Sequence, residues 1–215
     1  MTNLILNQKI GFEQILNSLK KNEKIKNIQI RRHSKGGRSD GKIISPRKGD
    51  FIKRIYRFID FKRNIILHQK AIYLRTIYDP NRTASIGLLC YPMGIISYIL
   101  KPAKIENGEM IGNIENPKDP IFYGDASKIA NFNSGVLIYN INGKFIRSAG
   151  ASAILVRKDA EQALLKMKSG ELRYFNQEMM ATSGTVNNEN HFLRNYKKAG
   201  TMRLLGKRPR TRPLL

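Results

Sequence analysis

Six short strings along the chain combine Arg or Lys with Gly, Pro, Ser or Asn, and they hold the residues best suited to chemistry. They are GGRSDGKI (36–43), YRFIDFKRN (56–64), YDPNRTASI (78–86), RSAGASA (147–153), SGELR (169–173) and LGKRPRTR (205–212). Small residues let the backbone approach a phosphate closely, and the cationic groups neutralise its charge. The strings therefore indicate contact with a phosphate-rich polymer rather than catalysis.

Two of the strings present an arginine beside a turn. Asp79-Pro80-Asn81 is a strong turn signal, so we expect a rigid tip to hold Arg82, which then loses little entropy when it binds a phosphate. Arg147 is followed by Ser-Ala-Gly at 148–150, and these small residues would let an RNA groove approach the backbone. The alternative for each arginine is an ordinary surface charge.

Other cations are candidates because they lie in glycine-rich or strand-end positions. GGRSDGKI lacks the spacing of a P-loop and could also be a plain linker. Lys62 and Arg63 follow a predicted strand, where the alternative is an edge charge that deters aggregation. The predicted RNA-binding residues are Arg38, Lys42, Arg47, Lys62, Arg63, Arg82, Arg147, Arg203, Lys207, Arg208, Arg210 and Arg212.

The net charge supports a polyanionic partner. The 215 residues carry a formal charge of +23, which destabilises a compact state unless a polyanion neutralises it. Residues 31–63 have a net charge of +9 and residues 194–215 one of +8, whereas the long middle, 64–193, has only +3. We therefore expect an N-terminal arm (31–54) and a C-terminal arm (196–215) that are extended and become ordered only against RNA.

Catalytic, metal-binding and membrane functions find little support in the sequence. His33, His68 and His191 are far apart, and no Cys/His or acidic grouping has the spacing of a metal site. The single cysteine, Cys90, lies in an apolar run and is predicted to be a core residue. No stretch approaches 18 consecutive apolar residues, so no membrane span is expected. We expect no enzyme activity and no cofactor apart from Mg²⁺ ions held by the RNA itself.

The middle of the chain shows short β-type runs separated by turn signals. Strands are predicted at 55–61, 71–78, 85–91 and 95–100. After a presumed linker at 115–128, further strands are predicted at 135–141, 153–157, 163–167 and 171–175, and a short helix could form at 188–199. Asn142-Gly143 is a strong hairpin signal, because both central residues of a type I′ turn need a positive φ. The pattern predicts two small barrels in succession.

The strings also resemble, in order, those of the L2 family of universal large-subunit ribosomal proteins. That family shows GGR-x-x-x-G-x-I, YR-x-x-DFKR, YDPNR, RSAG, SGE-x-R, A-T-x-G-x-V and LG-x-RP-x-x-R segments. Here they occupy 36–43, 56–63, 78–82, 147–150, 169–173, 181–186 and 205–212, so the resemblance covers about residues 35–213. Each string is weak alone, but their order and spacing make the resemblance specific.

The resemblance implies a fold and a function. The fold would be mostly β, with an OB-fold-like barrel followed by an SH3-like barrel and basic extended arms. The domains would be an N-terminal extension (1–34), an OB-like RNA-binding domain with a leading basic arm (35–118), an SH3-like barrel (119–195) and a basic C-terminal arm (196–215). The protein would bind large-subunit rRNA near the peptidyl-transferase region, support subunit association and translation, and contact neighbouring ribosomal proteins. The family's RNA-contacting arginines fall on Arg82 and Arg147.

Two departures from the family pattern are visible. Where the family has a GGGHK-like loop, this chain has KGDFIK (48–53). The family also continues past its RP-x-x-R segment into a glycine-rich basic extension, whereas this sequence stops at Leu215. We expect a separately encoded polypeptide beside Leu215 to supply that part.

Other functions and the cellular location stay open at this point. One alternative is a free OB-fold protein or translation factor that binds single-stranded RNA, for which Tyr56, Phe58 and Tyr73 would be the stacking residues. An RNA-modifying or RNA-cleaving enzyme is the other, but no acid–base pair supports it. Ile and Asn make up roughly a fifth of the chain and Trp is absent, a bias typical of AT-rich organelle genes. We therefore expect a mitochondrial ribosome rather than a plastid or bacterial one.

Overall fold

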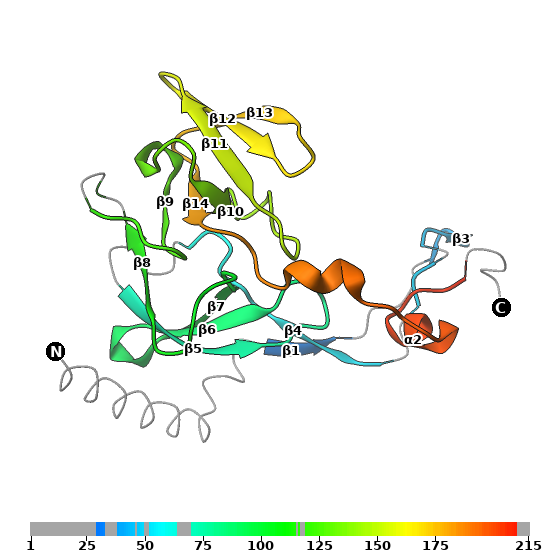
Figure 1. The fold of residues 1–215 in the computed structure, drawn as a ribbon. Helices are drawn as coiled ribbons and strands as arrows, with labels where there is room; N and C mark the ends of the chain where they lie inside the picture. Colours follow the sequence, from blue (N-terminus) through cyan, green and yellow to red (C-terminus); the bar gives the residue numbers. More distant parts are fainter. Residues whose placement is uncertain are drawn as a thin grey trace.

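The computed structural model describes residues 29–32, 38–45, 47–49, 52–63, 70–114, 116 and 119–209, with the backbone alone at 29–32, 38 and 93. Strands dominate this part of the chain. Ten of them form one continuous sheet in the order β13-β12-β11-β10-β14-β9-β8-β5-β6-β7 (Figure 1). The predicted fold class, mostly β with two successive sets of short strands, is confirmed.

The OB-like half contains β5 (Lys70–Ile77), β6 (Ile86–Cys90), β7 (Ile96–Leu100) and β8 (Met110–Ile114), which pair antiparallel in the order β8-β5-β6-β7. The strands predicted at 71–78, 85–91 and 95–100 agree with β5, β6 and β7 to within one residue at each end. The prediction missed β8, because its Gly112-Asn113 interrupts the apolar pattern. A 3₁₀ turn, η2 (Pro92–Gly94), connects β6 to β7.

A β-bulge in β5 gives this half a core on both faces of its sheet. The bulge lies between Tyr73 and Arg75, so the consecutive residues Tyr73 and Leu74 are both fully buried. Tyr73 packs in one cluster with Leu89 and Ile99, while Leu74 packs in another with Leu88 and Tyr98. All five residues of β6 are therefore buried, which explains its continuous apolar run. The last of them, Cys90, is a core residue as predicted.

The SH3-like half contains β9 (Ala126–Lys128), β10 (Leu137–Tyr139), β11 (Ala153–Lys158), β12 (Gln162–Met167), β13 (Leu172–Asn176) and β14 (Met180–Ser183). Its separate core includes Phe132, Ile138, Leu155, Leu165 and Phe175. The strands predicted around 153–157, 163–167 and 171–175 are confirmed, and the one predicted at 135–141 is shorter. A 3₁₀ turn, η3 (Ile129–Asn131), follows β9.

The two halves are not separated by a simple linker. The linker predicted at 115–128 is wrong for its last three residues, which form a strand. Strand β9 lies within that range and pairs in parallel with β8 and antiparallel with β14. The buried carboxylate of Asp125 accepts backbone N–H groups from Gly112 (2.7 Å) and Phe122 (2.8 Å). Burial raises the pKa of this carboxyl above its ordinary value. The polar sequence before β9 obscured a strand whose polar groups are satisfied inside the fold.

Two tight hairpin turns use the same chemistry. Asn142 and Gly143 both have positive φ (48° and 66°), and Lys144 N–H donates to Ile141 O (3.0 Å), which confirms the predicted turn. Asp40 and Gly41 also have positive φ (51° and 74°) and join β2 (Arg38–Ser39) to β3 (Lys42–Ile43). The Asp-Gly pair in GGRSDGKI carried that signal, but the string was interpreted as a loop.

The arms are more structured than predicted. Strand β1 (Gln29–Arg32) pairs antiparallel with β4 (Arg54–Arg57). A 3₁₀ helix, η4 (Glu189–Leu193), and an α-helix, α2 (Ala199–Leu204), follow β14. The expectation of a wholly extended C-terminal arm is therefore wrong, because Ala199–Leu204 is helical. Residues 1–28 and 210–215, including Arg210, Arg212 and Leu215, lie outside the described residues.

Within the described part of the chain, no helix is long and apolar enough to cross a membrane.

Candidate nucleic-acid interface

Phe61 brings two of the predicted arginines together. The guanidinium carbon of Arg82 lies 5.4 Å from the centroid of the Phe61 ring, and that of Arg147 lies 4.7 Å from the same centroid. Both distances are within the range of a cation–π interaction. Three strings that are far apart in the sequence therefore meet at one place, defined here as the Phe61 site (Phe61, Arg82 and Arg147).

The chain bends after β4, and this bend places Phe61 beside the two arginines. The predicted strand 55–61 ends at Arg57, and Asp60 N–H then donates to Tyr98 O (2.8 Å), so that Ile59 forms a parallel bridge with Tyr98. The Phe61 carbonyl accepts the Asn140 amide N–H from the other half (2.7 Å). Gly143 has φ +66°, and a Cβ there would lie 2.9 Å from the Cβ of Phe61, so a glycine is needed at this contact.

A buried carboxylate holds Arg82. Asp79 is only 1% exposed, and it accepts the Asn81 N–H (3.1 Å) and the Nε–H of Arg82 (2.5 Å), while a guanidinium nitrogen of Arg57 lies 4.0 Å away. The side chain of Arg82 is consequently only 18% exposed. The turn is rigid, as the DPN sequence predicts, but Arg82 also has a structural role that the sequence did not reveal.

Arg147 is the exposed member of the site. Its turn is fixed by neighbours from both halves: Ala149 N–H donates to Thr83 Oγ1 (3.2 Å), and Gly150 N–H donates to Val186 O (3.2 Å). Beneath these turns, a buried cluster of Ala84, Leu100, Tyr139 and Val186 joins the halves. We refer to this cluster as the barrel interface. Packing at the barrel interface therefore sets the position of Arg147.

Changing Gly150 to alanine should disturb this turn. Gly150 has φ +63°, and an added Cβ would lie 2.9 Å from the backbone Cα of Glu189. The left-handed conformation alone costs about 1–2 kcal/mol for an alanine, and the close contact adds to that. Gly170 is a matched control, since it has φ +90° and nothing within 4 Å of an added Cβ. We expect denaturant unfolding to show a larger loss of stability for G150A than for G170A. RNA affinity should fall only for G150A. Equal losses of stability and of affinity in the two variants would contradict this account.

Arg63 corrects one of the sequence predictions. It is 2% exposed and lies in the interior, with φ +57°. Its N–H donates to Asp60 Oδ1 (2.8 Å), its guanidinium donates to Gly112 O (3.5 Å), and its carbonyl accepts the Asn113 amide (2.8 Å). Arg63 therefore links the segment after β4 to β8, and we exclude it from the proposed RNA contacts. Its neighbour Lys62 is exposed.

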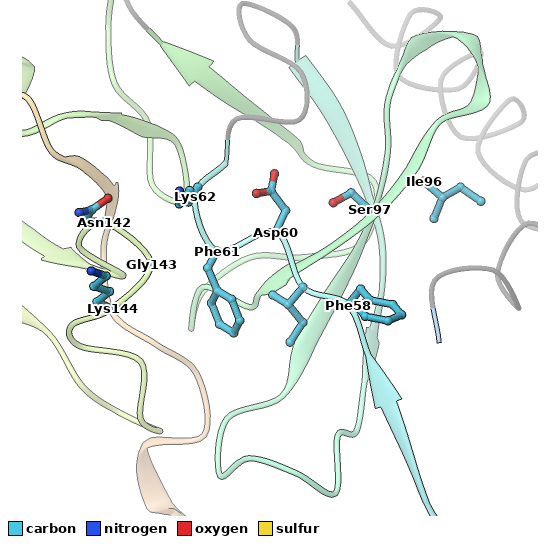
Figure 2. Close-up of a pocket in the computed structure, with 10 residues that line it drawn as sticks. Phe58, Asp60, Phe61, Lys62, Ile96, Ser97, Asn142, Gly143 and Lys144 are labelled. Atoms are coloured by element: carbon cyan, nitrogen blue, oxygen red, sulfur yellow. The ribbon is translucent and has the colours of Figure 1, made fainter. Parts of the chain in front are cut away.

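A cavity of about 500 Å³ lies beside the Phe61 site, between the segment Phe58–Lys62 and the turn Asn142–Lys144. Figure 2 shows the turn residues facing Phe61 and Lys62 across this space. Lys62 and Lys144 are both exposed at its rim. Lys144 extends the cationic surface onto the second half, and the sequence prediction did not include it.

Four of the remaining described candidates lie where the two arms meet. Arg47, Arg203, Lys207 and Arg208 line one cavity of about 790 Å³. Lys42 is exposed on β3, and Arg38 is on β2 with its side chain outside the described atoms. The structure thus gathers most described candidates into two places, the Phe61 site and the meeting point of the arms.

The alternative stacking residues do not form a platform. Tyr73 is fully buried, and the rings of Tyr56 and Phe58 pack edge to face on each other with centroids 5.6 Å apart. Of the three, only Phe58 is exposed. Among the described residues there is also no group of three or more His, Cys, Asp or Glu that could hold a metal ion.

Comparison with known protein families gives two adjoining matches. Residues 25–113 match the model described as Ribosomal Proteins L2, RNA binding N-terminal domain, and residues 123–214 match Ribosomal Proteins L2, C-terminal domain. The boundary between the two models falls between β8 and β9, where the two halves of the sheet meet.

Curated relatives agree with these matches. The chain is 41% identical over 184 residues to large ribosomal subunit protein uL2 of Ruegeria sp. (strain TM1040), covering 82% of this chain and 65% of the relative. It is 39% identical over 199 residues to the uL2 protein of Granulibacter bethesdensis, covering 89% of this chain and 71% of the relative. The uL2 protein of Roseobacter denitrificans is 41% identical over 184 residues. The chain thus spans about two thirds of the length of these relatives.

Proposed function

Because the chain belongs to the L2 family of ribosomal proteins, we propose that it is a structural constituent of the large ribosomal subunit. In this role it binds large-subunit rRNA near the peptidyl-transferase region and supports subunit association and translation. Neighbouring ribosomal proteins are its further partners. The chain holds RNA in place and is not an enzyme, and any Mg²⁺ in its surroundings is held by the RNA.

The observation that carries this proposal is the convergence of Arg82 and Arg147 on the Phe61 ring. Both cations are held in place by packing before RNA arrives, so little side-chain entropy remains to be lost on binding. The exposed Arg147 can form two parallel hydrogen bonds to a phosphate. Lys62 and Lys144 lie at the neighbouring cavity and extend the positive surface. Contacts from such a fixed cationic surface to RNA phosphates would set the orientation of the chain on the RNA.

A mitochondrial ribosome is the location that we propose. The support is compositional: Ile and Asn make up roughly a fifth of the chain and Trp is absent. The curated relatives named above are bacterial proteins and do not favour this location. A separately encoded segment beside Leu215 stays a prediction, since Leu215 lies outside the described residues.

Sedimentation of the tagged chain in cell extracts tests the proposed function. A structural constituent should sediment with the large subunit and stay there through moderate salt, because many phosphate contacts hold it at once. Fractionation of mitochondria before lysis tests the location in the same experiment. If the chain is released from the particle by a small rise in salt, or is found only in the free pool, the structural role is wrong and a translation factor becomes the better account.

A further inference from the structure

The two cationic arms are paired with each other in the structure. Gly49 N–H donates to Gly206 O (3.0 Å), Arg208 N–H donates to Arg47 O (2.9 Å), and Lys48 forms an antiparallel bridge with Lys207. The arm junction, defined as residues 47–49 and 206–208, thus joins positions about 160 residues apart. Figure 1 shows α2 and β3 at this end of the molecule, away from the ten-stranded sheet.

Glycines make the close approach possible. Gly206 has φ +83°, and a Cβ there would lie 2.6 Å from the carbonyl oxygen of Gly49. A Cβ on Gly49 would lie 2.6 Å from Nε of Arg208, so the Arg208 side chain lies directly on the Gly49 backbone. In addition, Arg54 donates a guanidinium hydrogen bond to Leu204 O (3.2 Å), which ties β4 to the end of α2. The junction is therefore a specific contact with its own packing.

The cavity beside the junction is lined by cations. Its lining residues are Arg47, Ala199, Gly200, Met202, Arg203, Lys207, Arg208 and Pro209. Four of these are cationic, and none of the described lining residues is acidic. Arg208 Nε is enclosed and has no hydrogen-bond partner among the described residues. The space of about 790 Å³ is large enough for phosphate groups, and it is open beside Gly200, where a Cβ would meet nothing within 4 Å.

We propose that this cavity is a composite phosphate-binding site, built jointly by the two arms and occupied by backbone phosphates of the rRNA. This inference rests on the proposed function, since it names the RNA group that the arms bind. Like charges brought this close repel each other, and an anion between them removes that repulsion. Phosphate binding and pairing of the arms are consequently one coupled event: the anion holds the junction closed, and the closed junction forms the site.

Hydrogen exchange of the full-length chain with inorganic phosphate as the probe tests this coupling. The amide protons of Gly49 and Arg208 report on the junction, because both are hydrogen-bonded across it. Phosphate at ten times its dissociation constant should slow their exchange about tenfold, because it binds only the closed form. Chloride at the same ionic strength should not slow the exchange of these two amide protons. R208Q should remove the response to phosphate, whereas K166Q, which changes an exposed lysine on β12, should keep it.

Two outcomes of this experiment would overturn the proposal. One is exchange at Gly49 and Arg208 that is already slow without phosphate and does not respond to it, which would show a junction that needs no anion. The other is an equal response to chloride and phosphate, which would show general screening rather than a site.

A double-mutant cycle with RNA tests whether the two arms act as one site. R47Q and R208Q should each weaken binding to a large-subunit rRNA fragment about tenfold. The double variant should be scarcely weaker than either single one, because each change already opens the shared site. Losses that multiply to about a hundredfold would mean independent arms and would overturn the proposal. A separate comparison tests the proposed function. That function is wrong if the wild-type chain binds this fragment no better than an unrelated RNA of equal length, whatever the double-mutant cycle and the phosphate response show.

Discussion

Replacing Arg63 with methionine is expected to lower the free energy of unfolding by about 3 kcal/mol or more. The change removes a buried cation and leaves the buried carboxylate of Asp125 without it. Burial raises the pKa of Asp125, and the Arg63 guanidinium opposes that rise. The same guanidinium opposes the rise that burial causes in the pKa of Tyr91. Denaturant unfolding of R63M and wild type would measure the loss.

The pH dependence separates lost charge from lost packing in R63M. Without the guanidinium, the pKa of Asp125 should rise further in the folded state. For an acid whose folded pKa lies above its unfolded value, the cost of the ionised form is present at high pH and disappears as pH falls through the folded pKa. The deficit of R63M relative to wild type should therefore shrink on acidification. K62M changes the exposed neighbour and should alter stability by less than about 0.5 kcal/mol. A deficit for R63M as small as that of K62M would show that Arg63 is dispensable to the fold.

Replacing Arg147 with alanine is expected to weaken RNA binding by about 1–3 kcal/mol, a tenfold to hundredfold loss of affinity, because a charge-assisted contact is removed. Arg147 is exposed and its contact to Phe61 is at the surface, so the stability of the free protein should change little. Filter binding or anisotropy with an rRNA fragment, combined with denaturant unfolding, measures both quantities.

Replacing Arg82 with alanine is expected to have two effects. It removes a cation from the Phe61 site and also leaves the buried carboxylate of Asp79 with a weaker cationic partner, Arg57, at 4.0 Å. R82A should therefore lose stability as well as affinity, while R147A loses affinity alone. K166A is a suitable control, because Lys166 is exposed on β12 and lies outside the six strings. If R147A destabilises the protein as much as R82A does, the assigned division of roles is wrong.

Much of the fold was predictable because its core strands are short apolar runs bounded by turns. Strands β5, β6 and β7 and the hairpin at Asn142-Gly143 follow directly from such patterns. By contrast, β8 contains Gly112 and the buried Asn113, and β9 contains the buried Ser127 and directly follows the buried Asp125. Their burial depends on hydrogen bonds between segments distant in sequence, and a local sequence pattern does not show which segments will form those bonds.

The candidate interface was predictable in its residue types but not in its arrangement. Arg82 and Arg147 were identified from their turns, yet Phe61, which joins them, appeared to be one more apolar strand residue. Arg63 seemed equivalent to Lys62, because a strand end does not show which side chain turns inward. The order of strings along the chain cannot show that 61, 82 and 147 converge, or that 47 and 208 lie side by side.

The central claim is that the Phe61 site and the arm junction face rRNA within the large subunit. Ultraviolet cross-linking of the purified particle, with cross-linked peptides identified by mass spectrometry, tests it most directly. We expect cross-links to rRNA from peptides around Arg147, Lys144 and the arms at 47–49 and 203–208. The hairpin of β12 and β13 should give few, because it belongs to neither the Phe61 site nor the arm junction and its Arg173 is paired with Glu171. Cross-links concentrated on that hairpin, with none from Arg147 or the arms, would contradict the account.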